Sequence, residues 1–415
     1  MRRWSAYVGR LQTWIHAYRH LGPRRATVAA ARRIAHGGRG RYRAFKLERR
    51  PLTVTRDEVR TALGGRERGT ALSAAAQALP SVTRWARGLS NLTPAERRSL
   101  LARADDVMAH RFDLLGSGKV DLGAQIDWHR DFKSGRVWPL RHSSQIPVSY
   151  PDSSDIKVPW ELSRFQHLPL LVAAHLLTGE RRYVDEVGAE IGSWIQENPV
   201  EFGVNWACTM DVAIRGVNWV AALALCPELP GESRWVDDAV GSLLLHARFI
   251  RSHLEYGSAR GNHYLSDIVG LLVISGLFQG SQEGREWSRW AVRELGREVR
   301  HQVRPDGCDH EASTSYHRLV AELFIVAADA ADVLVPEALD PGVREAIDRM
   351  LGFVADYTRP DGLAPQIGDV DNGRLLPLGD YAVADQRSHL HLFKQADRPY
   401  RPAVASAAYP HGGFY

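Results

Sequence analysis

Two clusters of polar residues contain side chains that could carry out proton transfer. The first spans residues 261–264 (GNHY), and the second spans residues 306–317 (DGCDHEASTSYH). Each cluster leads into a stretch with helical periodicity, so we expect its side chains at the start of a helix rather than on a packed face. Together the clusters supply an amide, imidazoles and a phenol. These groups suit the removal of a proton from carbon beside a carboxylate better than they suit hydrolysis.

Most of the chain has the apolar periodicity of amphipathic helices. From about residue 92 onward, apolar residues recur at spacings of three and four. The clearest stretches are 206–225, 235–256, 263–279, 286–304, 312–334 and 342–357. The two-residue alternation of a half-buried strand is not found before the last dozen residues. The sequence therefore predicts an all-α fold.

The loops between these helices indicate how the helices are arranged. Longer loops that carry motifs lie near Gly203, Gly261, Gly307 and Gly362, one helix pair apart, and the tetrapeptide RPDG ends at the last two of these glycines. Repetition every two helices is typical of stacked helical hairpins, in which alternate loops gather on one rim. An open solenoid and an incomplete α/α toroid both satisfy this pattern. The long Gly- and Trp-bearing loops favour the toroid, with a central cleft.

Positive charge is concentrated in the N-terminal part of the chain. Residues 1–50 contain 14 Lys or Arg and one acid, whereas the whole chain has a formal charge of only +5, so the remainder is mildly acidic. We expect residues 1–90 to form a basic helical leader, residues 91–400 an α/α toroid, and residues 401–415 the start of a truncated β segment. The basic stretch would bind an acidic polymer or a membrane surface, or would serve only solubility.

Several classes of function find no support in the sequence. Three scattered Cys residues predict neither a disulfide framework nor a zinc site. His310, Glu311 and His317 lack the spacing of the His-Glu-x-x-His helix, and no phosphate-binding loop or dinucleotide motif is present, so no metal or cofactor is expected. Neither a membrane span nor a secretory signal is predicted, and no nucleic-acid partner is expected. The cellular location and the oligomeric state stay open.

Residues 127–374 resemble the heparinase II/III family of polysaccharide lyases, which is related in fold to the alginate lyases. The resemblance rests, in order, on DWHRD (127–131), KVPWELSR (157–164), GVNW (203–206), MDVAIRGVNW (210–219), the two clusters above and GDVDNGR (368–374). Members of this family join an incomplete α/α toroid to a C-terminal antiparallel β-sandwich and cleave uronic-acid polymers by β-elimination. The resemblance therefore implies an acidic polysaccharide substrate. It also implies a β-sandwich that this chain is expected to lack.

The resemblance also implies roles for individual residues. The family's catalytic Asn and Tyr fall on Asn262 and Tyr316, and His263 is the toroid's candidate base. Asn262 would neutralise the uronate carboxylate, aided by Arg215 or Arg260, because the enolate that forms beside a carboxylate needs preorganised donors. Tyr316 would protonate the leaving oxygen or, as phenolate, take the proton. Further residues expected to bind or orient substrate are Trp128, His129, Asn205, Trp206, His310, Glu311, His317 and Asp369.

Each of these assignments has a structural alternative. Asn262 and Ser313 are residue types that cap helices, and Tyr316 would pack as an ordinary core residue. Arg215 would pair with a buried carboxylate instead of contacting substrate. Asp369 would hold a loop together through an Asx-type turn.

Two other functions also fit the sequence. One is a toroid that binds acidic glycans without catalysis. The other is an α/α-toroid glycoside hydrolase, which needs two opposed carboxylates across the cleft. Glu311 and Asp369 are the pair that the sequence offers for this role.

Overall fold

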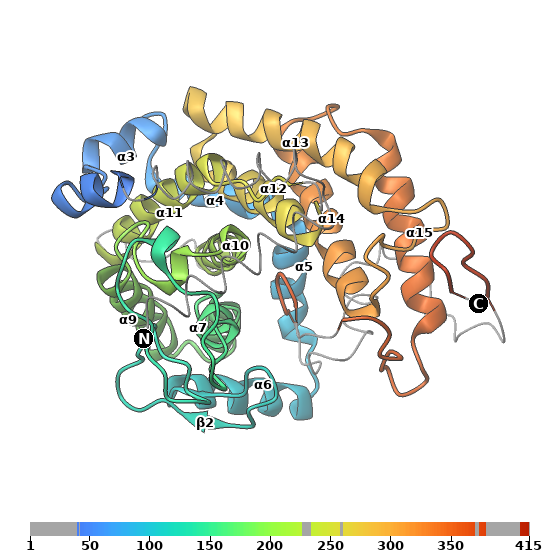
Figure 1. Cartoon of the computed structure of the whole chain (residues 1–415), viewed down its shortest axis with the longest axis horizontal. Coiled ribbons are helices and arrows are strands. Elements are labelled where there is room, and N and C mark those ends of the chain that lie inside the picture. The colour runs from blue at the N-terminus through green and yellow to red at the C-terminus, as the bar shows by residue number, and fades with distance from the viewer. Residues whose placement is uncertain are drawn as a thin grey trace, which may run out of the picture.

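The structure is a computed structural model, and it describes residue 40 and residues 42–225, 234–257, 260–369, 373–378 and 407–414. Within these residues the regular secondary structure is almost entirely helical (Figure 1). The basic leader expected within residues 1–39, and residues 370–372 of the family-like GDVDNGR stretch, lie outside the described residues. The elements are α3 (Arg56–Ala62), α4 (Arg68–Gln77), α5 (Pro80–Gly88), α6 (Pro94–Met108), β1 (Arg111–Phe112), β2 (Val120–Asp121), α7 (Lys157–Leu162), α8 (Leu168–Thr178), α9 (Arg182–Glu197), α10 (Thr209–Leu225), α11 (Arg234–Ser252), α12 (Asn262–Ser275), α13 (Gln282–Gln302), α14 (Thr314–Leu334) and α15 (Pro341–Tyr357).

Four consecutive helical hairpins form the body of the molecule. They are α8–α9, α10–α11, α12–α13 and α14–α15, and the two helices of each hairpin pack against each other. The first helices also contact one another in chain order, α8 with α10, α10 with α12 and α12 with α14, so they form an inner layer. In the outer layer, α9 contacts α11 and α13 contacts α15 (Figure 1). This two-layer arc confirms the predicted all-α incomplete toroid.

The N-terminal helices complete the core. α4 packs against α10, α5 packs against both α10 and α14, and α6 packs against α8 and α9. Because α10 also contacts α8, α11 and α12, it is surrounded by helices and is buried along its whole length. Removing this apolar surface from water is the main force that holds the arc together. Within the stretch expected as a leader, α4 and α5 are thus part of the common core.

Local capping chemistry explains where several helices begin and end. Thr93 forms a capping box with Glu96 at the start of α6. Ser281 accepts from the backbone N–H of Gly284, so α13 begins at Gln282, earlier than the periodicity indicated. Gly179 ends α8 with a left-handed φ of 74°, a conformation that glycine adopts without strain.

A small β-hairpin, which no pattern in the sequence predicts, interrupts the helices. β1 and β2 pair antiparallel, but strands of two residues are too short to show an alternating pattern. Residues 407–414, within the stretch expected to start a β segment, form a turn closed by an antiparallel bridge between Tyr409 and Phe414. Both rings contact Phe353 of α15, with ring centroids 4.6 and 5.0 Å away.

Candidate active site

The two polar clusters meet where α12 and α14 begin. These helices pack side by side, and hydrogen bonds join the loops that precede them. Gln302, the last residue of α13, donates from Nε2 to the carbonyl of Gly261 (3.2 Å). The carbonyl of Gln302 accepts from the backbone N–H of His310 (2.8 Å). One glutamine therefore ties the first cluster to the second.

Asn262 is the first residue of α12, and Glu311 holds it from the loop before α14. Oε1 of Glu311 accepts from the backbone N–H of Asn262 (3.0 Å) and from its Nδ2 (3.1 Å), and Oε2 lies 3.3 Å from Nδ2. A carboxylate in this position also complements the helix dipole. A Cβ at Gly261 would lie 2.4 Å from Glu311 Oε1, so glycine leaves room for the contact. The N-cap is Gly261, so the alternative that Asn262 caps the helix is wrong.

Tyr316 lies half-buried in the first turn of α14. Ser313 is the N-cap, as its residue type predicted, because its Oγ accepts from the backbone N–H of Tyr316 (3.1 Å). The same hydroxyl donates to the carbonyl of Asp369 (2.6 Å), so Asp369 supports this turn through its backbone while its side chain is exposed. Ala312 adopts a left-handed φ of 54°, which is strained for a residue with a Cβ. Strain of this kind persists where the surrounding contacts enforce it.

His263 is the second residue of α12, and its side chain is 54% exposed. Its Nδ1 lies 2.9 Å from Oε2 of Glu255. Burial alone lowers the pKa of His263, but the hydrogen bond to Glu255 and its charge outweigh burial, so the pKa is raised. Glu255 also accepts from the backbone N–H of Met210 (3.2 Å), and the sulfur of Cys208 lies 3.9 Å from both Glu255 and His263. With Nδ1 facing a carboxylate, Nε2 is the nitrogen that can accept a proton.

The acids around His263 were not among the predicted site residues. The backbone N–H of Glu255 donates to Oδ2 of Asp267 (2.7 Å), and burial raises the pKa of Asp267 well above its usual range. No motif spacing marks either residue in the sequence. The available signal was an acid shortly before the GNHY cluster and another within an apolar helix.

His310 and His317 have different surroundings although both belong to the second cluster. His317 is buried, accepts at Nδ1 from the backbone N–H of Asp309 (3.1 Å) and donates from Nε2 to the carbonyl of Met350 (3.1 Å). Both of its ring nitrogens are therefore used to hold the loop. His310 is partly exposed, and the hydrogen bond from its Nδ1 to Asp309 raises its pKa. His310, Asp309 and Glu311 present ligand atoms within 4.8 Å of one another.

Four residues expected near substrate lie in the interior, at most 1% exposed: Trp128, Asn205, Trp206 and Arg215. The Arg215 guanidinium stacks 4.1 Å from the ring centroid of Trp194 and donates to Nε2 of His246 (2.9 Å). It also donates to the carbonyl of Asn205 (3.2 Å), rather than forming the alternative hydrogen bond to a carboxylate. Burial lowers the pKa of Arg215 to about 9. Because these four residues are buried, they cannot contact substrate directly, and the expectation that they bind it is corrected. An orienting role is still compatible with their positions.

His129 and Arg260 are half-buried and already have partners. Nε2 of His129 lies 3.1 Å from the carbonyl oxygen of Glu197. Arg260 forms an ion pair with the fully buried carboxylate of Glu298 (3.4 Å) and donates to the hydroxyl of Tyr256 (3.1 Å). The side chain of Arg260 is still 25% exposed next to the Asn262 loop, so it can also face an anion.

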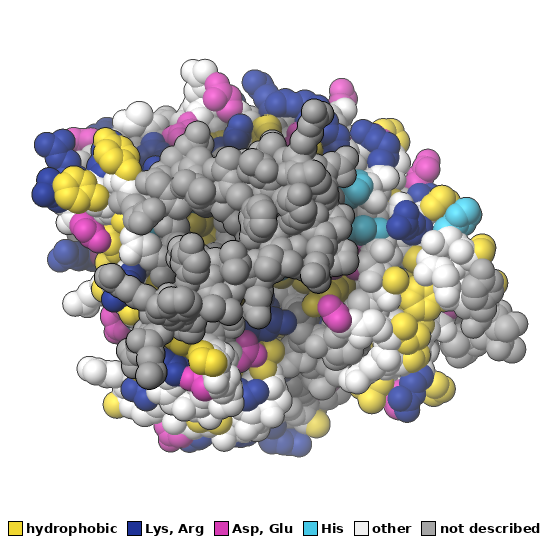
Figure 2. Space-filling model, in the orientation of Figure 1, with side chains coloured by type: hydrophobic (Ala, Val, Ile, Leu, Met, Phe, Trp, Pro, Cys, Tyr) yellow, Lys and Arg dark blue, Asp and Glu magenta, His cyan; other side chains and the backbone are white. Residues whose placement is uncertain are grey.

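The described surface carries charges of both signs. On the face in Figure 2, Lys and Arg side chains are interspersed with Asp and Glu rather than gathered in one patch. In the part of the chain that the structure describes, no helix is both long enough and apolar enough to cross a membrane.

Comparisons with known proteins identify the family of this chain. The model of the family described as Heparinase II/III N-terminus matches residues 70–378. The heparin-sulfate lyase of Pedobacter heparinus is 22% identical over 274 residues, which are 64% of this chain and 38% of that protein. The heparin-sulfate lyase of Bacteroides stercoris is 23% identical over 288 residues, 64% of this chain and 40% of the relative. The matched part of the chain thus spans about two fifths of these relatives.

Some solved structures also show a partial similarity to this chain. The crystal structure of heparan sulfate lyase HepC from Pedobacter heparinus has a TM-score of 0.48 at 19% identity, over 70% of this chain and 46% of that one. A heparinase III has a TM-score of 0.46 at 22% identity, over 66% of this chain and 41% of that one. The family match extends over most of the chain and includes both polar clusters. The chain therefore belongs to the heparinase II/III family.

Proposed function

We propose that this protein acts as a polysaccharide lyase on a uronic-acid polymer of the heparan sulfate type. The family match and the two relatives named heparin-sulfate lyase support the substrate class. The single observation that carries the proposal is the contact between Asn262 and Glu311, because it joins the amide of one cluster to the loop that precedes Tyr316. The reaction is β-elimination: the C5–H bond and the C4–O bond break, and a C4=C5 double bond forms.

Asn262 neutralises the carboxylate of the bound uronate in this proposal. An amide nitrogen carries two N–H groups, so one can serve Glu311 while the other donates to the substrate. The negative charge grows on the substrate carboxylate as the C5 proton leaves, and a preorganised donor stabilises that charge most in the transition state. Arg260 adds positive charge from the residue before Gly261.

His263 and Tyr316 share the proton transfers. His263 has a partly exposed ring whose Nδ1 is held by Glu255, so its Nε2 is available to take the C5 proton. Tyr316 protonates the departing C4 oxygen, since a phenol is a stronger acid than the sugar hydroxyl that forms. If Tyr316 is ionised, it takes the C5 proton itself. The pH dependence of the rate in variants of His263 and Tyr316 distinguishes these two assignments of the base.

Glu311 serves as a positioning residue, not as the acid of a hydrolase. Its carboxylate accepts two hydrogen bonds from Asn262 and packs against Gly261. A general acid for glycoside hydrolysis must instead carry a proton and face the glycosidic oxygen. In its contacts with Asn262, Glu311 accepts hydrogen bonds and is not the donor.

Incubation with defined polymers tests the proposal. The full chain is mixed with heparan sulfate, hyaluronan and alginate, and ultraviolet absorbance of the unsaturated uronate is followed together with reducing ends. We expect absorbance and reducing ends to rise in step with heparan sulfate. Reducing ends without absorbance would establish a hydrolase, and binding of the polymer without either signal would establish a glycan-binding toroid. A rise in absorbance with alginate alone would identify alginate, and not heparan sulfate, as the substrate.

A further inference from the structure

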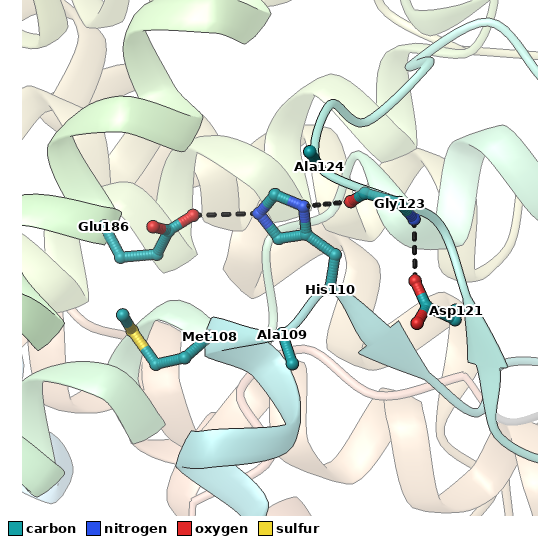
Figure 3. Close-up of a pocket in the computed structure, with 7 residues that line it drawn as sticks. All are labelled: Met108, Ala109, His110, Asp121, Gly123, Ala124 and Glu186. Atoms are coloured by element: carbon teal, nitrogen blue, oxygen red, sulfur yellow. Dashed lines mark hydrogen bonds and ion pairs between the residues drawn. The ribbon is translucent and has the colours of Figure 1, made fainter.

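A second polar site lies on elements that do not contribute to the candidate active site. A cavity of about 450 Å³ opens between the end of α6, the β1–β2 hairpin and α9 (Figure 3). Its lining residues are Met108, Ala109, His110, Asp121, Gly123, Ala124 and Glu186. Figure 3 shows the ring of His110 held between Gly123 on one side and Glu186 on the other.

His110 is oriented in the way that a metal-binding histidine is oriented. Its Nδ1 lies 2.7 Å from the carbonyl oxygen of Gly123, and a carbonyl can only accept, so Nδ1 carries the hydrogen. This bond directs Nε2 to Oε1 of Glu186, 3.0 Å away. A protonated Nε2 donates to this carboxylate, and a metal ion bound by both atoms would take the place of that proton. Donation from the other ring nitrogen to a backbone carbonyl is also the usual support of a metal-ligating histidine.

Glu190 provides a third ligand, and its buried carboxylate is independent support for a cation site. It follows Glu186 by one turn of α9, and it is 3% exposed. Its Oε2 is hydrogen-bonded to Nε2 of His167, whereas its buried Oε1 has no hydrogen-bond partner among the described residues. A buried carboxylate oxygen without a partner is costly, because water is lost and nothing replaces it. Ligand atoms of His110, Glu186 and Glu190 all lie within 4.8 Å of one another.

We propose that His110, Glu186 and Glu190 bind one divalent transition-metal ion of the zinc class. One imidazole and two carboxylates are ligand types that such ions accept, and the adjoining cavity leaves room for water to complete the coordination. Small adjustments of the two glutamate side chains bring the ligand atoms to metal-bonding distances. His167 acts as a positioning residue that fixes the orientation of Glu190. The ion would fasten the β1–β2 hairpin to α9, so its role is structural.

Sequence spacing could not have suggested this site. His110 follows α6, whereas Glu186 and Glu190 are on α9, so the ligands meet only in the folded chain. The expectation that no metal is bound rested on local motifs, which detect sites whose ligands lie close together in the sequence.

Metal titration of the full chain tests the proposal. The protein, free of any affinity tag, is stripped with a chelator and titrated with Zn²⁺ by calorimetry. The test variants are His110→Asn, Glu186→Gln and Glu190→Gln. Asn tolerates the left-handed φ of 48° at position 110, and the two Gln substitutions preserve shape. Asp185→Asn is the matched control, because it removes an exposed carboxylate from the same helix. Circular dichroism confirms that each variant is folded.

We expect the parent chain and Asp185→Asn to bind one Zn²⁺ with the same affinity. The affinity should fall more than about 100-fold in each ligand variant, and about 10–100-fold in His167→Gln. Zn²⁺ should raise the melting temperature of the parent and the control, but not that of Glu190→Gln. The proposal is overturned if the parent chain binds no Zn²⁺, or if Glu186→Gln and Glu190→Gln keep the parent affinity.

Among the residues that the structure describes, two other groups could hold a cation, and Co²⁺ spectra distinguish them from the proposed site. They are Cys208, Glu255 and His263, and Asp309, His310 and Glu311. Co²⁺ in the proposed site should lack a thiolate charge-transfer band, and its spectrum should be unchanged by Glu255→Gln and Glu311→Gln. A thiolate band that disappears in Cys208→Ser would assign the bound ion to the other cluster and contradict the proposal.

Discussion

The side-chain nitrogen of Asn262 lies 3.1 Å from Oε1 of Glu311, and the backbone nitrogen of Asn262 lies 3.0 Å from the same oxygen. Asn262 begins α12, whereas Glu311 lies in the loop before α14, so this contact helps to fix the first turns of the two helices relative to each other. A single carboxylate thereby positions both the amide and the loop that precedes Tyr316. The proposed catalysis depends on this alignment, because misplacement of reacting groups by about 1 Å can reduce a rate about 10²-fold.

Gly261→Ala should impair turnover without unfolding the protein. The new Cβ would lie 2.4 Å from Glu311 Oε1 and push that carboxylate away from Asn262. The φ of −151° at position 261 is not in the left-handed region that favours glycine. We expect kcat/KM to fall about 10²-fold, with an unchanged circular dichroism spectrum. Gly257→Ala is the matched control, since a Cβ at that exposed position meets no atom within 4 Å. Equal activity of the two variants would show that the Glu311 contact is dispensable.

Glu255→Gln should move the acidic limb of the pH–rate profile to lower pH. Burial opposes the charged form of His263, but its hydrogen bond to Glu255 outweighs burial and raises the pKa. A base must be neutral, so activity falls as the pH drops through this pKa. Without the Glu255 charge the pKa falls, and the neutral form persists to lower pH. Measurements of kcat/KM against pH, with Glu283→Gln as a surface control, test this. An acidic limb that does not move would exclude His263 as the base.

Arg215→Met should destabilise the protein rather than weaken substrate binding. The substitution removes the hydrogen bonds to His246 and to the carbonyl of Asn205 and leaves both acceptors buried. Each unsatisfied buried acceptor costs about 1–3 kcal/mol, so we expect a loss of about 2–6 kcal/mol in the free energy of unfolding. Chemical denaturation measures this, with the exposed Arg289→Met as the control. Unchanged stability together with a raised KM would restore a role for Arg215 in substrate contact.

The fold could be predicted from the sequence because its signals are local. Apolar periodicity gave the helices, and the recurrence of loops every two helices gave the hairpin stack that the structure confirms. Ser313 was recognised as a helix cap for the same reason. The β1–β2 pair was missed, since two residues per strand carry no periodic pattern.

The surroundings of the site residues could not be predicted, because they depend on long-range packing. Arg215 has the charge of a surface or substrate-binding residue, yet Trp194, Trp206 and His246 enclose it. Glu255 belongs to no motif in the sequence. It becomes the partner of His263 only in the folded chain, where the loop before α12 brings the two side chains together. Residue type therefore predicts which groups are available, whereas the tertiary structure decides which of them face solvent.

Turnover by Tyr316→Phe tests the central claim most directly. The variant removes one hydroxyl, and Tyr256→Phe removes a comparable hydroxyl from an exposed neighbour of Arg260. With heparan sulfate as substrate, we expect formation of unsaturated uronate to fall by at least about 10²-fold in Tyr316→Phe, while polymer binding and the Tyr256→Phe rate stay near those of the parent. Full activity of Tyr316→Phe would contradict the account, because the proton transfer assigned to that phenol would then have another source.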